Sequence, residues 1–475
     1  ARKRAAIVKF IDCEEEVRLN DANLEYDDMS HFKACAVRHL GDVMAVVDRK
    51  IHDGDILPRH GPGATADKIT GNSKYNQQEW PRRLEEGFFP HGEFLFSSWS
   101  QSNPEVGDSS GVLLLEPGAE RPVRVITVPK TLKTPRIIAV EPTCMQYMQQ
   151  GLLEQFVLEL ERCDTLKGSI GFTDQRPNQE AARAGSISGD LATLDLSEAS
   201  DRVSNLLVRE AFGRFPLLCE ALQATRSSKA DVPGHGIITL TKFASMGSAV
   251  CFPVEAMMFL TIIALSEEQR LSRSLTKKDL SVLLSVVRVY GDDLIVPVRL
   301  AQIVSENLKL YGFKLNSNKS FWTGKFRESC GRDYYDGVDV TVTYVRRNMP
   351  STRHNASEIV SLFSLRNQLY KAGMWRSAMT LDEELKRLAP LPLVGEGSPV
   401  LGRHSFLGYQ TQKMCRQLHK PLVKGLCIKV ETRKSRLTGH QALMKFFLKR
   451  GRDPIFDVKH LERYGRPERV DTKVR

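Results

Sequence analysis

The sequence lacks long hydrophobic runs, paired-cysteine motifs, internal repeats and arrays of aromatic residues. Its longest apolar stretch, Phe252 to Leu265, is interrupted by Glu255 and is too short to span a bilayer, so we expect no membrane association. The nine cysteines are scattered without CxxC spacing, which argues against a disulfide framework and favours reduced thiols in a cytosol-like compartment. Aromatic residues make up only 8% of the chain, and no group of them could form a base-stacking surface.

Two familiar signals are missing as well. The opening ARKRAAIVKF has neither an initiator methionine nor the apolar core of a signal peptide, so we expect a processed or incomplete N-terminus. The glycine-containing stretch HGPGAT, residues 60–65, is not followed by Gly-Lys-Ser or Gly-Lys-Thr and is therefore not a P-loop. We interpret it as a structural loop.

The chain does contain an ordinary globular composition with surplus positive charge. Its 475 residues are 41% hydrophobic and 26% charged, which is enough apolar material for a sizeable core. Lysine and arginine number 68 against 57 acidic residues, a net charge of +11. This surplus favours a polyanionic partner, most simply nucleic acid, although a basic soluble protein without such a partner is the alternative.

Hydrophobic periodicity predicts an α+β fold. Helical spacing occurs in residues 32–47, 144–162, 252–269, 300–311 and 354–390. Residues 123–142 predict two strands around a basic loop, and residues 188–212 predict a strand followed by a helix. The elements interleave without a steady βαβ rhythm, which favours α+β.

Two adjacent carboxylates interrupt the apolar run VVRVYGDDLIVPV, residues 286–298. Two β-prone runs joined at Gly291, Asp292 and Asp293 predict a hairpin, whose tip would lift both carboxylates out of the core. Adjacent carboxylates without a nearby cation suit a divalent metal such as Mg²⁺, which prefers hard oxygen ligands. A plain hairpin turn is the alternative, and a metal site needs further oxygen ligands from elsewhere.

The segment LATLDLSEASDRVS, residues 191–204, offers those ligands. Leu191, Thr193 and Asp195 alternate as in a strand, so Asp195 would lie at the strand end, and the following turn into a helix would bring Asp201 back near it. Alone, Asp195 would be interpreted as a helix N-cap and Asp201 as a surface charge in a first turn. In the presence of YGDD we expect the carboxylates to converge on one pair of ions.

DLSEASD and YGDD together resemble the two metal-binding motifs of viral RNA-dependent RNA polymerases. VPKTLKTPRIIAVEP, DQRPNQ, SMGSAVCFPVEAMMF, YGFKLNSNKSF and FRESCG accompany them in the order seen in replicases of single-stranded RNA bacteriophages, the leviviruses. The similarity covers roughly residues 55–350. It implies a right-hand polymerase with an antiparallel palm sheet backed by helices, which replicates a positive-sense RNA genome.

The resemblance assigns roles to the carboxylates. Asp195 and Asp292 would be the principal ligands of two Mg²⁺ ions, or of Mn²⁺, and Asp293 would be a weaker or outer ligand. Such ions activate the primer 3′-hydroxyl and neutralise the triphosphate. Asp201 would help read the ribose 2′-hydroxyl, which distinguishes RNA precursors from DNA precursors.

VPKTLKTPRII resembles the basic finger loop above the nucleotide channel. Lys130, Lys133 and Arg136 recur every three residues and would bind the entering triphosphate. A solvated basic turn is the alternative for these residues.

SMGSAVCFPVE, residues 245–255, is a loop of small residues that runs into a helix. Small residues let the backbone approach the template or the nascent base pair closely, and the resemblance makes Ser245, Gly247 and Ser248 substrate-binding positions. The commonest polymerase pattern has an asparagine in this helix, and here none follows. Glu255 lies near that position, and it could contact the sugar or pair with an arginine as a structural residue.

The remaining motifs give further expectations. Lys319 would protonate the departing pyrophosphate as a general acid, the alternative being a surface lysine. FRESCG resembles the primer-grip turn, so Arg327 would contact phosphate, whereas Cys330 has no base partner nearby and is expected to be a packing residue. DQRPNQ, residues 174–179, would either contact the template or form a capped loop.

The resemblance also divides the chain into lobes. We expect an N-terminal helical extension in 1–54, fingers in 55–190 with an insertion at 214–240, palm in 191–213 and 241–350, and the thumb with a basic C-terminal tail in 351–475. The tail would either line the RNA exit or be a solvated extension.

Substrates and partners follow from the same resemblance. It implies a single-stranded RNA template, NTPs, the cytoplasm of the infected bacterial cell, and host elongation factors Tu and Ts and ribosomal protein S1. Three alternatives stay open: the polymerase of an ourmia-like or narna-like virus, a reverse transcriptase-like enzyme, against which Asp201 argues, and a non-catalytic RNA-binding scaffold.

Overall fold

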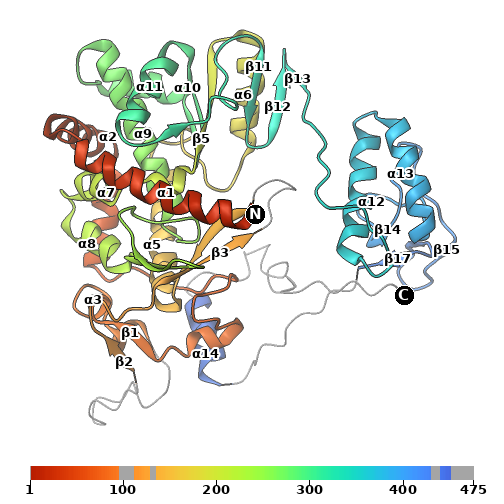
Figure 1. Ribbon diagram of the computed structural model, residues 1–475, viewed down its shortest axis with the longest axis horizontal. Coiled ribbons are helices and arrows are strands. Elements are labelled where there is room, and N and C mark those ends of the chain that lie inside the picture. Colours follow the sequence, from red (N-terminus) through yellow and green to blue (C-terminus); the bar gives the residue numbers. More distant parts are fainter. Residues whose placement is uncertain (1, 96–111, 129–134, 429–438, 451–475) are drawn as a thin grey trace. The chain divides into compact units, whose positions relative to one another are not determined.

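The computed structural model describes residues 2–95, 112–128, 135–428 and 439–450, which form two compact units (Figure 1). Most described residues up to Thr341, together with 439–450, belong to the first unit, and 342–428 belong to the second. Both contain helices and strands, so the predicted α+β class is confirmed. Within the described residues, no helix is long and apolar enough to cross a membrane.

The central sheet of the first unit is antiparallel and has the strand order β10-β5-β9-β8. Its strands are β5 (Leu191–Ser197), β8 (Arg288–Tyr290), β9 (Asp293–Pro297) and β10 (Lys314–Leu315). β8 and β9 form the hairpin predicted around YGDD, and Tyr290 pairs with Asp293 across the turn. β9 also pairs with β5, from Leu191 opposite Pro297 to Asp195 opposite Asp293.

Helices beside this sheet supply most of the core. α9 (Cys251–Leu271) is buried along most of its length, as expected for a helix that is apolar on all sides. α2 (Tyr26–His52) and α11 (Val298–Leu310) pack against α9, and both helices had been predicted from periodicity. The same core includes residues of α5 (Thr143–Arg162), α7 (Asn205–Phe212) and α8 (Pro216–Thr225).

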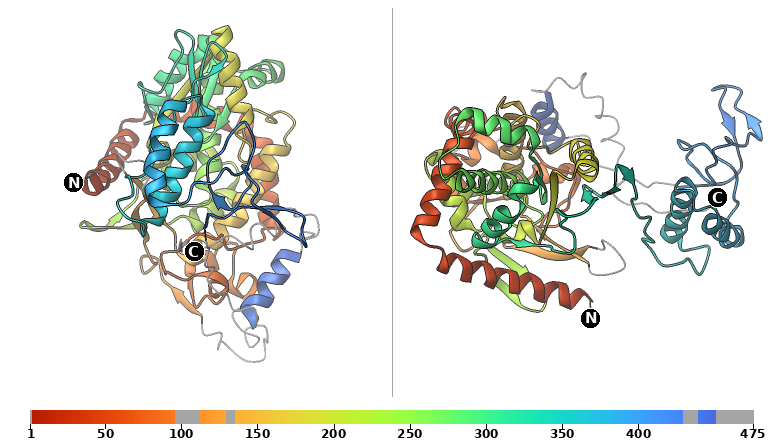
Figure 2. Two further views of the ribbon diagram at one scale, coloured as in Figure 1. Left: turned by 90° about the vertical axis from the view of Figure 1, so that its right-hand side faces the viewer. Right: turned by 90° about the horizontal axis from the view of Figure 1, so that it is seen from above.

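A second four-stranded sheet has the order β4-β3-β6-β7. Its strands are β3 (Val123–Val128), β4 (Arg136–Val140), β6 (Lys229–Val232) and β7 (Gly236–Thr239). β3 and β4 are the two strands predicted on either side of the basic loop. Phe10 of α1 (Arg2–Asn23) packs into the small core of this sheet. Figure 2 shows α1, in dark red, running along the outside of the first unit.

Shorter elements complete the first unit. β11 (Phe326–Ser329), β12 (Arg332–Tyr335) and β13 (Val338–Asp339) form an antiparallel meander, and α6 (Arg176–Ser188) packs against β11 and β12. α14 (His440–Arg450) packs against the 3-10 segment η1 (Gly71–Tyr75). The others are β1 (Glu79–Pro81), α3 (Arg82–Glu85), α4 (His91–Phe94), β2 (Leu113–Leu115), η3 (Ala199–Arg202) and α10 (Lys277–Val286).

The second unit is built around a helical hairpin. α12 (Ala356–Lys371) and α13 (Trp375–Leu388) pack together, as the helical pattern in 354–390 predicted. A buried ion pair joins them, with Arg366 Nε 2.7 Å from Asp382 Oδ1 and Arg366 Nη2 3.1 Å from Asp382 Oδ2. Two small pairs of strands follow, β14 (Val400–Leu401) with β17 (Leu426–Cys427) and β15 (Lys413–Met414) with β16 (Pro421–Leu422).

The division between the two units lies near one of the expected lobe boundaries. It falls after Thr341, close to the expected start of the thumb at residue 351. α14 lies inside the range expected for thumb and tail but belongs to the first unit. The fingers, palm and thumb ranges themselves stay predictions.

Candidate catalytic site

Three aspartates come together where β5, β8 and β9 meet. Asp195 on β5 lies directly opposite Asp293 on β9. Side chains of directly opposite residues share one face of a sheet, with Cβ atoms about 4.5–5.5 Å apart. Asp292 lies in the turn and is exposed, whereas Asp195 and Asp293 are partly buried. The structure therefore brings the three aspartates to one end of the sheet, although their carboxylate oxygens do not all lie within 4.8 Å of one another. Only Asp292 lies at the hairpin tip, because Asp293 already begins β9.

The turn that presents Asp292 depends on Gly291. This residue has φ +58°, and a Cβ built on it would lie 2.2 Å from Cε2 of Phe252. The ring of Phe252 is itself fixed by edge contact with Tyr290, at 5.5 Å between centroids. A residue without a side chain is thus needed for both the backbone conformation and the close approach to α9.

Burial and the nearby charge of Asp292 disfavour the charged forms of Asp195 and Asp293. Burial and the charge of Asp292 raise the pKa of Asp293 to about 6. Burial also raises the pKa of Asp195, although Lys319 and a hydrogen bond from Asn316 oppose the shift. A divalent cation would relieve this repulsion, and the all-oxygen donor set fits Mg²⁺ or Mn²⁺.

Residues from YGFKLNSNKSF hold Asp195 in place. Asn316 Nδ2 donates to Asp195 Oδ2 at 2.7 Å, and the Asn316 backbone N–H donates to the Asp195 carbonyl at 2.9 Å. The Asp195 backbone N–H donates to Ser320 Oγ at 3.1 Å. Asn316 was not among the predicted site residues, which in this motif included only Lys319.

Lys319 lies beside Asp195, as its predicted role requires. Its Nζ is 3.1 Å from Oε1 of Glu328, and its side chain is 51% exposed. Burial alone would lower the pKa of Lys319, but Asp195 and Glu328 outweigh burial, so the pKa is raised. Lys319 is therefore a charged ammonium at the edge of the aspartate cluster.

Residues of the DQRPNQ motif hydrogen-bond to the backbone of the hairpin and to that of Cys330. α6 begins at Arg176, and Asn178 Nδ2 lies 3.4 Å from the carbonyl oxygen of Asp293. Gln179 Nε2 donates to the Cys330 carbonyl at 3.2 Å. Burial and the nearby Asp293 raise the pKa of the Cys330 thiol to about 12, in keeping with its expected packing role.

Asp201 and Glu255 lie near each other, and Glu255 is also close enough to Asp292 to interact with its charge. Asp201 Oδ1 is 3.2 Å from Nζ of Lys242, a fully buried lysine that sequence reasoning also missed. Glu255 accepts a hydrogen bond from Ser200 Oγ at 2.6 Å, and among the described residues no arginine forms an ion pair with it. Burial raises the pKa of Glu255 to about 8, with contributions from Asp292 and Asp201.

The small-residue loop is anchored to β4. The Ala139 backbone N–H donates to the Met246 carbonyl at 2.9 Å, and a Cβ on Gly247 would lie 2.0 Å from the Ala139 carbonyl oxygen. Ser245 and Ser248 are buried, and Ser248 Oγ donates to Gln149 Oε1 at 3.1 Å. Of the three predicted loop positions, only Gly247 is exposed.

The basic residues predicted to contact phosphate fall into two groups. Arg136 is exposed at the start of β4, whereas Lys130 and Lys133 lie outside the described residues. Arg327 is fully buried, and its guanidinium donates to backbone carbonyls, including those of Leu191 and Gly324. In this structure Arg327 braces the start of β5, and its burial gives the predicted phosphate contact no support.

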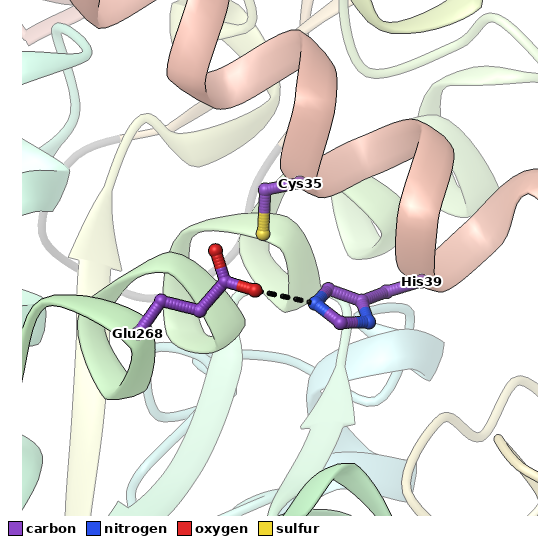
Figure 3. Close-up of side chains that lie close together, drawn as sticks. All are labelled: Cys35, His39 and Glu268. Atoms are coloured by element: carbon purple, nitrogen blue, oxygen red, sulfur yellow. Dashed lines mark hydrogen bonds and ion pairs between the residues drawn. The ribbon is translucent and has the colours of Figure 1, made fainter. Parts of the chain in front are cut away.

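A second polar cluster lies away from the aspartates, between α2 and α9 (Figure 3). Cys35, His39 and Glu268 are the one group in the described part of the chain whose potential metal-ligand atoms all lie within 4.8 Å. Glu268 Oε1 accepts from His39 Nε2 at 3.1 Å and from the Leu275 N–H at 3.0 Å, and it also pairs with Arg38. Burial raises the pKa of the Cys35 thiol. These contacts account for the cluster as a polar bridge between the two helices.

A family model and several known proteins match part of this chain. The family model for RNA replicase, beta-chain, matches residues 119–396. The RNA-directed RNA polymerase subunit beta of Escherichia virus Qbeta is 36% identical over 256 residues, 53% of this chain and 39% of the relative. The RNA-directed RNA polymerase beta chain of Enterobacteria phage fr is 32% identical over 318 residues, 65% of this chain and 51% of the relative. The matches thus cover about half of these relatives or less.

Solved structures give looser matches. The RNA-dependent RNA polymerase of BmCPV at quiescent state aligns with a TM-score of 0.47 and 10% identity, over 77% of this chain and 32% of that one. The insertion-loop deletion mutant of the RNA-dependent RNA polymerase of a human picorbirnavirus aligns with a TM-score of 0.39 and 10% identity, over 55% and 56% of the respective chains. TM-scores below 0.5 mark only a loose likeness.

Proposed function

This chain belongs to the RNA replicase, beta-chain family, and on that premise we propose that it is the RNA-directed RNA polymerase of a single-stranded RNA bacteriophage. The observation that carries the proposal is the pairing of Asp195 with Asp293, beside Asp292, inside the segment that the family model matches. The proposed reaction transfers nucleoside monophosphate from an NTP to the 3′ end of a growing RNA strand, and it releases pyrophosphate.

The aspartates are the proposed metal ligands. Asp195 and Asp292 would hold two Mg²⁺ ions, with Asp293 as a weaker ligand, and Mn²⁺ suits the same oxygen donors. When bound, such ions activate the attacking 3′-hydroxyl and neutralise charge on the triphosphate. The raised pKa values of Asp195 and Asp293 support this assignment, because a cation stabilises the charged forms that burial disfavours.

Other side chains then orient the substrate and move a proton. Asn316, bonded to Asp195 Oδ2, fixes the direction of that carboxylate. Lys319 would donate a proton from Nζ to the departing pyrophosphate, and its position beside Asp195 supports the role. Asp201 would accept a hydrogen bond from the ribose 2′-hydroxyl.

The entering nucleotide would meet a basic loop and a small-residue loop. Lys130, Lys133 and Arg136 would bind its phosphates, and the exposure of Arg136 supports this. Gly247 would allow the backbone to approach a base pair closely, while the buried Ser245 and Ser248 would shape the loop from below.

The right-hand architecture and the partners are part of the same proposal. The palm would be the sheet that carries the aspartates, with fingers and thumb in the ranges given above. The template would be single-stranded RNA, copied in the cytoplasm of the infected bacterium with elongation factors Tu and Ts and ribosomal protein S1. The relatives named above come from phages, which favours a phage polymerase over an ourmia-like or narna-like one.

A nucleotide-incorporation assay tests the function. The purified chain is incubated with single-stranded RNA, labelled NTPs and Mg²⁺, beside Asp292→Asn and the matched control Asp190→Asn, which changes an exposed aspartate just before β5. We expect product from the parent and the control and none from Asp292→Asn. Equal product from all three would identify a contaminant and reject the site. No product from the parent, even with Mn²⁺ and the host proteins, would favour the RNA-binding scaffold.

A further inference from the structure

The N-terminal helix α1 lies against the segment that carries Asp201. Its contacts recur at roughly one-turn intervals, so they come from one side of the helix. Cys13 Sγ, for example, lies 3.4 Å from the carbonyl oxygen of Asp201, and Asp21 Oδ2 accepts from Ser204 Oγ at 2.7 Å. The pairs along this face are Lys9–Glu198, Cys13–Asp201, Glu16–Arg202 and Asp21–Ser204.

Lys242 joins α1 to the Asp201 side chain. Its side chain is 0% exposed, and Nζ lies 3.2 Å from Asp201 Oδ1 and 3.3 Å from Glu14 Oε2. Nζ also lies 3.6 Å from the ring centroid of Phe10. Burial alone would lower the pKa of Lys242, but Asp201 and Glu14 outweigh burial and raise it, so the ammonium stays charged. A buried charge of this kind persists only where opposite charges meet it.

Glu14 fixes the backbone of Lys242 as well as its ammonium. Glu14 Oε1 accepts from the backbone N–H of Lys242 at 3.2 Å and from that of Thr241. Asp201 Oδ1 accepts a hydrogen bond from Lys242 Nζ, whereas none of the described residues hydrogen-bonds to Asp201 Oδ2. The Asp201 side chain is 15% exposed. One oxygen of Asp201 is thus tethered through Lys242 to α1, and the other is available to a ligand.

We propose that Lys242, held by Glu14 of α1, is a positioning residue that orients Asp201 toward the ribose 2′-hydroxyl, so that selection of ribonucleotides depends on the N-terminal helix. The inference rests on the proposed function of Asp201. A tethered carboxylate presents its free oxygen in one direction, whereas an untethered one rotates and hydrates. A site that loses a hydrogen bond from a charged group to a substrate hydroxyl loses about ten-fold or more of its preference for that hydroxyl.

The ratio of kcat/KM for ATP over dATP measures this preference. The full chain is compared with Glu14→Gln, with Lys242→Met, and with Glu15→Gln as the matched control. Glu15 lies on the same helix with its side chain 55% exposed, and its ion pair among the described residues is with Arg18. We expect the ratio to fall about ten-fold or more in Glu14→Gln and Lys242→Met and to stay at the parent value in Glu15→Gln. Lys242→Arg, which keeps the charge, should recover part of the ratio.

The outcomes separate this inference from the proposed function. Where the parent makes RNA but Glu14→Gln keeps the parent ratio and loses only thermal stability, α1 is a structural support and the inference is overturned alone. Where Lys242→Met does not fold, Glu14→Gln decides, because it keeps the buried lysine. Where the parent incorporates neither ATP nor dATP, the inference is overturned together with the proposed function.

Discussion

At the scale of single residues, burial and nearby negative charge raise the pKa values of Asp195, Asp293 and Glu255 above the ordinary values of these carboxyls. Glu255 is the extreme case, since it is 2% exposed and its pKa is raised to about 8. Asp293 follows, with a pKa of about 6. Both groups stay protonated to a higher pH in the folded chain than in the unfolded chain. Their contribution to the free energy of unfolding is therefore present at low pH and is lost as the pH rises toward these folded-state pKa values.

Glu255→Gln should flatten this pH dependence. A single group that is protonated only in the folded state lowers the free energy of unfolding by up to about 1.4 kcal/mol per pH unit, here between about pH 4.5 and 8. Glutamine cannot ionise and can still accept from Ser200. We expect the metal-free variant to lose less stability between pH 5 and pH 8 than the parent, as measured by urea unfolding.

The exposed Glu306, changed to glutamine, is the control and should keep the parent slope. Some slope should remain in Glu255→Gln, because Asp293 contributes with the same sign. An unchanged slope in Glu255→Gln would mean that Glu255 is already ionised in the folded chain.

The residues that act directly in the proposed chemistry could be found from sequence, and their supports could not. Asp195, Asp292 and Asp293 stand in motifs whose spacing predicts a strand and a hairpin. Lys242 and Glu14 carry no such pattern, because they meet across 228 positions and their contact is polar. The burial of Arg327 was equally hidden, since its partners are backbone carbonyls that any sequence provides.

At the scale of elements, the β8–β9 hairpin is the element in which we expect a small substitution to damage the site most. Gly291→Ala would place a methyl group against the ring of Phe252 in a backbone conformation that alanine rarely adopts. We expect a loss of unfolding free energy of about 2–4 kcal/mol and a large loss of nucleotide incorporation, measured by chemical unfolding and by the RNA synthesis assay.

Gly324→Ala separates the two causes. Gly324 has φ +62°, but a Cβ there would meet nothing within 4 Å. This control should cost only the conformational strain, about 1 kcal/mol, and should leave incorporation near the parent rate. Equal effects of the two substitutions would show that contact with Phe252 is unimportant.

Elements with a clear apolar period were predictable, and those held by polar contacts were not. α11 and the strands of the hairpin follow from regular spacing of large apolar residues, and α9 follows from its long, almost continuous run of them. α1 buries only Ala6, Phe10, Cys13, Glu14 and Val17, so its apolar pattern is weak. No helix was predicted from periodicity over its range, and only the resemblance led us to expect a helical extension in 1–54. Its place beside Asp201 comes from ion pairs and hydrogen bonds with residues far along the chain.

At the scale of the whole molecule, family membership and site geometry support the same activity independently. The family model covers residues 119–396, and the paired aspartates lie within that range. The net charge of +11 agrees with a nucleic-acid partner. α1 lies outside the matched segment yet contacts Asp201 and Lys242 within it, so the compact unit that holds the aspartates extends beyond the residues that the family model matches.

The most direct test of the account is the rate of a single nucleotide addition to an RNA primer on an RNA template, at saturating NTP and Mg²⁺. Asp195→Asn is compared with Asp190→Asn, the same change at an exposed position shortly before it in the chain. If Asp195 holds the metal that activates the primer, Asp195→Asn should be slower by about a thousand-fold or more, and Asp190→Asn should match the parent. A parent-like rate in Asp195→Asn would contradict the assignment of this carboxylate cluster as the catalytic site.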